Sequence, residues 1–123
     1  MVKIGSVEVK AKTILAPLSG CSDLSFRLIC REQGAKLAFF EMADCHSLIY
    51  GNVKRTDIFK TTAKDKPIAA QLIGPEPDLM LKAARILLKM VKPLFLDINA
   101  ACPVPKMLKK KAGAHLLREP DKL

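Results

Sequence analysis

The chain of 123 residues has the length of one ordinary domain, and 50% of its residues are hydrophobic, so it can form one moderate core. Its 21 Lys and Arg residues exceed its 12 Asp and Glu residues by nine charges, which favours a polyanionic partner such as nucleic acid. The sequence has neither a signal peptide nor an apolar run that could span a membrane, so we expect a cytoplasmic protein without membrane contact.

Residues 2–11 alternate apolar and charged side chains around a Gly-Ser pair, which predicts a β-hairpin that acts as a small lid or plug. Residues 13–16 predict a short buried strand, which Pro17 stops. Asp23 then caps a helix that ends near Gly34. We interpret the strand and the helix as a first βα unit.

Two further units follow the same pattern. Residues 37–40 predict a second strand that ends at Glu41, followed by a helix over about residues 43–50. Residues 67–73 predict a third strand, after which Pro77 opens a long amphipathic helix.

The fourth unit carries the strongest candidate for chemistry. An apolar strand over residues 94–98 runs directly into Asn99 and then Cys102, and a short basic helix over residues 106–111 follows. Only residues beyond the last buried position of a strand can leave the core, so we expect Cys102 to be displayed at a site.

Apolar strands that alternate with helices predict an α/β fold with a parallel sheet covered on both sides. The strands begin about every 25 to 30 residues, which is the spacing of a (β/α)8 barrel, where about 250 residues form eight units. We therefore expect the first half of a TIM-type barrel, with its polar strand ends meeting at one mouth. A doubly wound sheet is the alternative, but its GxGxxG loop is missing after the first strand.

The four cysteines show no CxxC spacing and no zinc signature, so we expect reduced thiols and no metal site. We interpret Cys21, Cys30 and Cys45 as packing residues.

Several segments carry a family resemblance. Residues 16–27, APLSGCSDLSFR, are similar to a segment written APMAGVTDxxFR, and the departures are Leu18, Ser19, Cys21 and Ser22. The later segments are EM at 41–42, QLIG at 71–74, DINxxCP at 97–103, Lys106, and GAxLL at 113–117. Ala101 stands where glycine is more common. In order and spacing, these segments resemble those of the tRNA-dihydrouridine synthases, which are flavin-dependent barrels.

The resemblance implies that FMN, reduced by NADPH, passes hydride to carbon 6 of a uracil in tRNA while a cysteine protonates carbon 5. Cys102 would be this proton donor. A thiol suits the role, because with an ordinary pKa of about 8.5 it holds its proton near neutral pH.

The resemblance also implies the ligand contacts. Pro17, Leu18 and Ser19 would line the flavin ring, and the amide of Gln71 would hydrogen-bond its polar edge, although Gln71 could instead only cap the sheet. Asn99 would hold the target uracil, which must be flipped out of the folded tRNA. We interpret Glu41 as a residue of the barrel mouth and leave it out of the site.

A basic surface would follow the tRNA phosphates. Its members are Lys54, Arg55, Lys106, Lys109, Lys110 and Lys111. The three consecutive lysines could equally be a solvated helix face.

Members of this family have a complete barrel and a helical C-terminal domain, so residues 1–123 would be the N-terminal half alone. We expect such a half to self-associate through its open sheet edges and to bind FMN weakly or not at all. Two alternatives stay open: another FMN-dependent barrel acting on small pyrimidines, and a non-catalytic RNA-binding or structural fragment. The basic charge favours tRNA over a small pyrimidine.

Overall fold

The computed structural model describes residues 2–51 and 56–123. It begins with an antiparallel hairpin of β1 (Val2–Ile4) and β2 (Val7–Val9). Gly5 in the turn has a φ of 58°, which glycine adopts without a steric penalty. The predicted N-terminal hairpin is confirmed.

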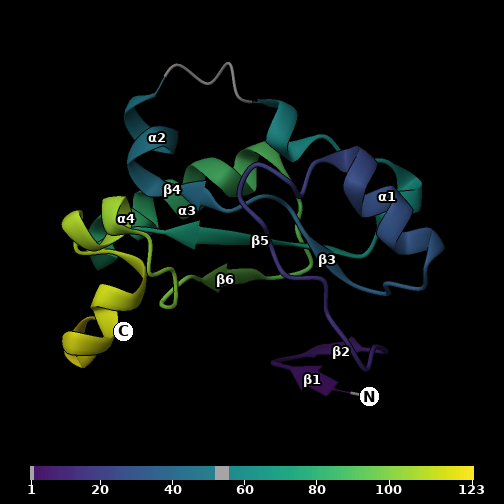
Figure 1. Ribbon diagram of the computed structural model, residues 1–123, viewed down its shortest axis with the longest axis horizontal. Helices are drawn as coiled ribbons and strands as arrows, with labels where there is room; N and C mark the ends of the chain where they lie inside the picture. Colours follow the sequence, from purple (N-terminus) through teal and green to yellow (C-terminus); the bar gives the residue numbers. More distant parts are fainter. Residues whose placement is uncertain (1, 52–55) are drawn as a thin grey trace.

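A parallel sheet forms the centre of the molecule (Figure 1). Its strands are β3 (Ala38–Phe39), β4 (Ala43–Asp44), β5 (Ile68–Ile73) and β6 (Leu96–Ile98). β3 and β4 pair with one side of β5, and β6 also pairs with β5 in parallel. The predicted α/β class with a parallel sheet is confirmed. Strands that are neighbours in the chain are also neighbours in the sheet, whereas a doubly wound sheet reverses its order at one point.

The first predicted strand is much shorter than expected. Leu15 makes an isolated parallel bridge to Ala38, and its N–H donates to the carbonyl of Leu37 at 3.0 Å. Within the described ranges this segment pairs on one side only, and Pro17 has no N–H with which to continue the ladder. Regular pairing therefore stops after one residue.

The second strand extends further than predicted, because it resumes after an interruption. Phe39 of β3 pairs with Ala69, and Ala43 of β4 pairs with Leu72, so residues 40–42 lie opposite only two residues of β5. One extra residue on one strand is a β-bulge, which bends the strand and redirects its side chains. The predicted helix therefore begins later than expected, and Ala43 belongs to a strand.

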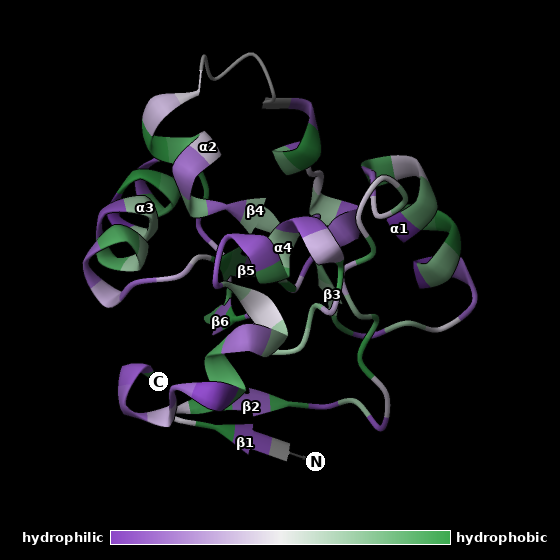
Figure 2. Ribbon diagram, turned by 60° about the vertical axis from the view of Figure 1, so that its left-hand side comes forward, coloured by the Kyte–Doolittle hydropathy of each residue, from purple (hydrophilic) through white to green (hydrophobic). Residues whose placement is uncertain are grey.

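The helices are α1 (Leu24–Glu32), α2 (Cys45–Tyr50), α3 (Pro77–Met90) and α4 (Pro105–Lys109). Short 3-10 turns lie at Thr56–Phe59, Ala63–Asp65, Gly113–Arg118 and Pro120–Lys122. The carboxylate of Asp23 accepts from the N–H of Phe26 at 2.8 Å, so the predicted cap of α1 is confirmed. Helices α1, α2 and α3 each carry both hydrophobic and hydrophilic residues, as expected for helices that cover a sheet (Figure 2).

The two faces of β5 pack against different partners. Ile68, Ala70 and Leu72 belong to a buried cluster that includes Ala83 and Leu87 of α3. Side chains alternate between the faces of a strand, so this face lies under the helices.

The opposite face of β5 is covered at one end by the hairpin. Ala69 packs in a second cluster with Val9, Leu37 and Phe39, which agrees with the predicted role of the hairpin as a plug. Gln71 follows Ala69 on the same face, nearer the C-terminal end of the strand. The face that the hairpin closes at one end therefore carries a polar side chain at the other.

No helix in residues 2–51 and 56–123 is both long and apolar enough to cross a membrane.

Candidate active site at the C-terminal ends of the strands

Polar side chains meet across β5 and β6 near the ends of both strands. Gln71 lies opposite Asp97 in the register, and its Nε2 donates to the Asp97 carboxylate at 2.6 Å. Asn99 lies on the same face two residues further along, and its Nδ2 donates to Oε1 of Gln71 at 2.9 Å. The structure thus brings Gln71 and Asn99, two of the predicted site residues, into direct contact.

Asn99 also holds the loop that carries Cys102. Its Oδ1 accepts from the N–H of Ala101 at 3.0 Å and from the N–H of Cys102 at 2.9 Å. Its own N–H donates to the carbonyl of Leu72 at 2.8 Å, which ties it to the sheet. Asn and Asp side chains often cap backbone turns in this way. In this arrangement Asn99 positions the backbone of Cys102.

Cys102 is half-buried and lines a cleft of about 590 Å³, within the size range of small-molecule sites. Ser19, from the loop between the first strand segment and α1, lines the same cleft. Pro17 and Leu18 directly precede Ser19, and 47% of the Leu18 residue surface is exposed. Residues from distant parts of the sequence therefore share one opening.

Residues of α2, α4 and the ends of β4 and β5 line the cleft. The arrowheads of β5 and β6 point to the side of the molecule where α2 and α4 lie (Figure 1). The residues that line the cleft besides Ser19 and Cys102 are Glu41, Met42, Ala43, Asp44, Ser47, Leu48, Gly51, Ile58, Phe59, Ile73, Val104, Lys106 and Met107. Met42 also joins the cleft to the polar cluster, because its sulfur lies 3.1 Å from Nδ2 of Asn99.

Glu41, interpreted from the sequence as a residue of the barrel mouth outside the site, contacts the loop of residues 17–20, the predicted flavin loop. Its Oε1 accepts from the N–H of Gly20 at 2.6 Å. The position of Glu41 at a strand end was the only signal for this contact. The bulge over residues 40–42, which redirects the side chains there, depends on pairing with β5 and has no local pattern.

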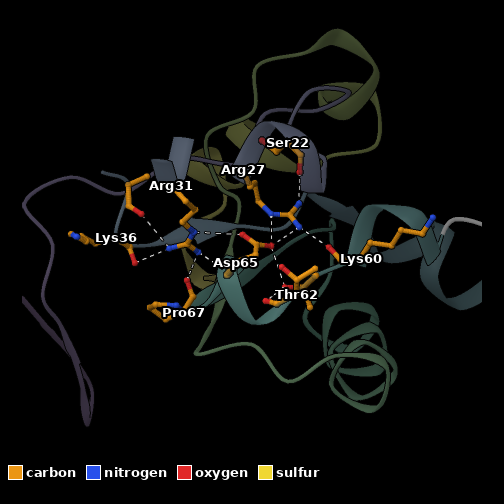
Figure 3. A network of polar contacts seen from close by, with 10 residues as sticks. Ser22, Arg27, Arg31, Lys36, Lys60, Thr62, Asp65 and Pro67 are labelled. Carbon is orange, nitrogen blue, oxygen red and sulfur yellow. Dashed lines mark hydrogen bonds and ion pairs between the residues drawn. The ribbon is translucent and has the colours of Figure 1, made fainter. Parts of the chain in front are cut away.

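A buried arginine hydrogen-bonds to the C-terminal end of the same loop (Figure 3). Arg27 is fully buried, and its guanidinium donates to the Ser22 carbonyl at 2.5 Å and to the Lys60 carbonyl at 2.6 Å. Two further bonds reach Oδ2 of Asp65 at 3.0 and 2.8 Å. The Oγ of Ser22 in turn accepts from the N–H of Leu18 at 2.7 Å. The network connects the predicted flavin loop to a segment about forty residues further along the chain.

A second arginine completes this network. Arg31 donates to the carbonyl oxygens of Asp65 at 2.8 Å and Pro67 at 2.6 Å. Its Nε also lies 3.5 Å from Oδ1 of Asp65. The buried carboxylate of Asp65 therefore lies near two positive charges, which offset the cost of removing its own charge from water.

The structure describes only some residues of the predicted basic surface. Lys54 and Arg55 lie outside the described residues. Lys106 is exposed and lines the cleft, whereas Lys110 forms an ion pair with Asp44 at 2.6 Å. Phosphate binding by these lysines stays a prediction.

The four thiols differ in environment. Cys45 is fully buried, so its predicted packing role is confirmed, and burial together with the charge of Asp44 raises the pKa of its thiol to about 12. Cys30 is half-buried, whereas Cys21 is exposed, so the packing role predicted for Cys21 is wrong. Cys21 lies in a tight turn before α1, where its N–H bonds to the carbonyl of Leu18 at 3.1 Å and its side chain faces solvent. Among the residues that the structure describes, no three His, Cys, Asp or Glu side chains form a group that could hold a metal ion.

A model of the dihydrouridine synthase family matches residues 14–123. The chain belongs to the dihydrouridine synthase family. The match confirms the resemblance inferred from the sequence, and it includes the loop of Ser19, the cluster of Gln71 and Asn99, and Cys102.

Individual members of the dihydrouridine synthase family match nearly the whole chain. It is 33% identical over 122 residues to a probable tRNA-dihydrouridine synthase of Treponema pallidum, which covers 99% of the chain and 36% of the relative. It is 34% identical over 120 residues to tRNA-dihydrouridine synthase B of Vibrio cholerae, covering 98% of the chain and 37% of the relative. A human tRNA-dihydrouridine(47) synthase [NAD(P)(+)]-like protein is 35% identical over 116 residues, which are 94% of the chain and 18% of the relative. The chain thus spans little more than a third, or less, of each of these relatives.

Proposed function

We propose that residues 1–123 form the N-terminal half of the flavin-binding barrel of a cytoplasmic tRNA-dihydrouridine synthase. The complete enzyme would reduce specific uridines of tRNA to dihydrouridine, with NADPH as reductant. The main support is the loop of Cys102, which Asn99 anchors to the sheet beside Gln71 and which opens into the same cleft as Ser19. The sequential order of the parallel strands supports the barrel.

The residues present fit one face of FMN. Leu18 and Ser19 form an exposed loop whose backbone is held by Ser22 and Glu41. The amide of Gln71 donates one hydrogen to Asp97 and accepts one bond from Asn99. An amide has two hydrogens and two lone pairs, so Gln71 keeps one donor and one acceptor for the polar edge of a flavin ring.

FMN, if bound beside Leu18, Ser19 and Gln71, would supply the hydride, and the role of this chain would be to place the proton donor. The thiol of Cys102 would give its proton to carbon 5 of the uracil, and its half-buried position at the cleft allows contact with a base. Asn99 would hold the uracil only if its amide exchanged one of its present partners, because its oxygen already accepts two backbone bonds.

The substrate proposed is tRNA rather than a free pyrimidine. The names of the relatives refer to tRNA, and the excess of nine positive charges suits a polyanion. Lys106 at the cleft, with Lys109 and Lys111 beyond it, would contact phosphates near the flipped base.

The chain by itself would self-associate and bind FMN poorly. Ile14 is 42% exposed and Ile29 is 61% exposed, and both line a shallow depression beside the bridge at Leu15. Apolar side chains next to a sheet edge favour association with another chain.

Flavin absorbance tests this proposal. Residues 1–123 joined to the remaining C-terminal part of the Vibrio cholerae relative form a complete chain, called the chimera below. We expect the purified chimera to carry the flavin absorption bands and residues 1–123 alone to lack them. A chimera that folds but does not bind added FMN would contradict the flavin site, and a flavin-bearing 123-residue chain would contradict the need for a second half.

A further inference from the structure

The carbonyl side of Cys102 is held by a segment that lies after α4. The N–H of Ala114 donates to the Cys102 carbonyl at 3.0 Å. Asn99 already holds the N–H of Cys102 at 2.9 Å. Both peptide groups of Cys102 are therefore hydrogen-bonded, one to the side chain of Asn99 in the same loop and one to the segment after α4.

Gly113 packs directly against Cys102. It is buried and has a φ of 63°, and a Cβ atom added to it would lie 2.6 Å from the Cys102 carbonyl oxygen and 3.0 Å from the Cys102 Cβ. The closer of these contacts is with backbone, which a rotation of a side chain cannot relieve. A larger residue at this position would therefore displace Cys102.

The segment that carries Gly113 is itself well anchored. The N–H of Ala112 donates to the carbonyl of Met107 at 3.0 Å, which fixes it to α4. Ala112 and Leu116 are each 2% exposed, so the core holds both sides of the glycine. Ala101, Pro103 and Val104, in the loop of Cys102, are exposed, so a clash at Gly113 would move this loop rather than the buried segment behind it.

We propose that Gly113 and Ala114 are positioning residues for Cys102. Together they determine how deep the Cys102 thiol lies in the cleft. Gly113 does so because it has no side chain to push the loop away, and Ala114 does so through the hydrogen bond from its N–H. The inference rests on the proposed function only where it treats Cys102 as the reacting residue.

Site-resolved alkylation of the 123-residue chain tests whether Gly113 positions Cys102. Iodoacetamide is added to the folded protein, and mass spectrometry measures the rate at Cys102 relative to that at the exposed Cys21. We expect Gly113→Ala to raise this ratio at least about fivefold, since displacement of the loop exposes the half-buried thiol of Cys102 to the reagent.

Gly5→Ala is the matched control. Gly5 has a nearly equal φ of 58° and no atom within 4 Å of an added Cβ. Its replacement imposes the same backbone strain without touching Cys102, so the ratio should stay within about twofold of the parent value. A Gly113→Ala protein that folds, as judged by circular dichroism, and keeps the parent ratio would overturn the proposal.

Hydrogen exchange of the unaltered chain covers the case in which Gly113→Ala does not fold. The amides of Cys102 and Ala114 should exchange at least about tenfold more slowly than unprotected amides, because both are hydrogen-bonded. Exchange of either amide at the unprotected rate would refute the proposed positioning of Cys102. Neither experiment uses FMN or tRNA, so failure of the proposed function would leave both results intact.

Discussion

Replacing Arg27 with methionine will lower the free energy of unfolding by about 3 to 5 kcal/mol, because it leaves the carboxylate of Asp65 buried without its main partner. Both side chains are 0% exposed, and their closest contact is 2.8 Å. The replacement also removes the hydrogen bonds to the carbonyls of Ser22 and Lys60. Urea denaturation followed by circular dichroism measures the loss.

An exposed ion pair nearby supplies the control. Asp57 and Lys60 lie 2.8 Å apart with exposed side chains, so Asp57→Asn should cost less than about 1 kcal/mol. Replacing both Arg27 and Asp65 with apolar residues should recover part of the loss, since the buried carboxylate is then gone and Arg31 keeps its bonds to the backbone carbonyls of residues 65 and 67. If Arg27→Met and Asp57→Asn have equal effects, the buried network does not hold the loop as described.

Replacing Cys102 with alanine in the chimera will lower the rate of dihydrouridine formation by about 10²-fold to 10⁴-fold, the usual contribution of a general acid. The proton for carbon 5 would then have to come from water. The rate is measured with tRNA, FMN and NADPH under initial-rate conditions, and tRNA affinity is measured separately to show that binding is retained.

Cys21→Ala is the corresponding control for Cys102→Ala. Cys21 is an exposed thiol in the turn before α1, so its loss should change the rate less than about twofold, as expected for a surface position. Equal rates for the Cys102→Ala chimera and its parent would remove Cys102 from the chemistry.

Local patterns predicted much of the fold. Asp23 and Pro77 lie at the starts of α1 and α3 as expected, because capping and the fixed φ of proline act over a few residues. The apolar runs that became β5 and β6 were also predictable from their composition.

Features that depend on pairing between distant segments could not be predicted. The bulge over residues 40–42 exists only relative to β5. Leu15 lies in an apolar run that suggests a strand, yet its pairing depends on neighbours that the local sequence does not encode.

In the candidate site, too, local patterns were predictable and contacts between distant segments were not. The strand-end rule and the family motifs placed Gln71, Asn99 and Cys102 together, and the structure brings them into one chain of contacts. The ion pair between Arg27 and Asp65 joins residues 38 positions apart. Charged residues usually lie at the surface, so neither residue could have been predicted to be buried.

The most direct measurement is the dihydrouridine content of tRNA treated with the chimera. Unmodified tRNA is incubated with the chimera, FMN and NADPH, and the nucleosides are then separated by mass. We expect dihydrouridine at one or a few uridines, formed only when NADPH and residues 1–123 are both present. A folded, flavin-bearing chimera that leaves every uridine unreduced would contradict the claim that this chain supplies half of a uridine-reducing site.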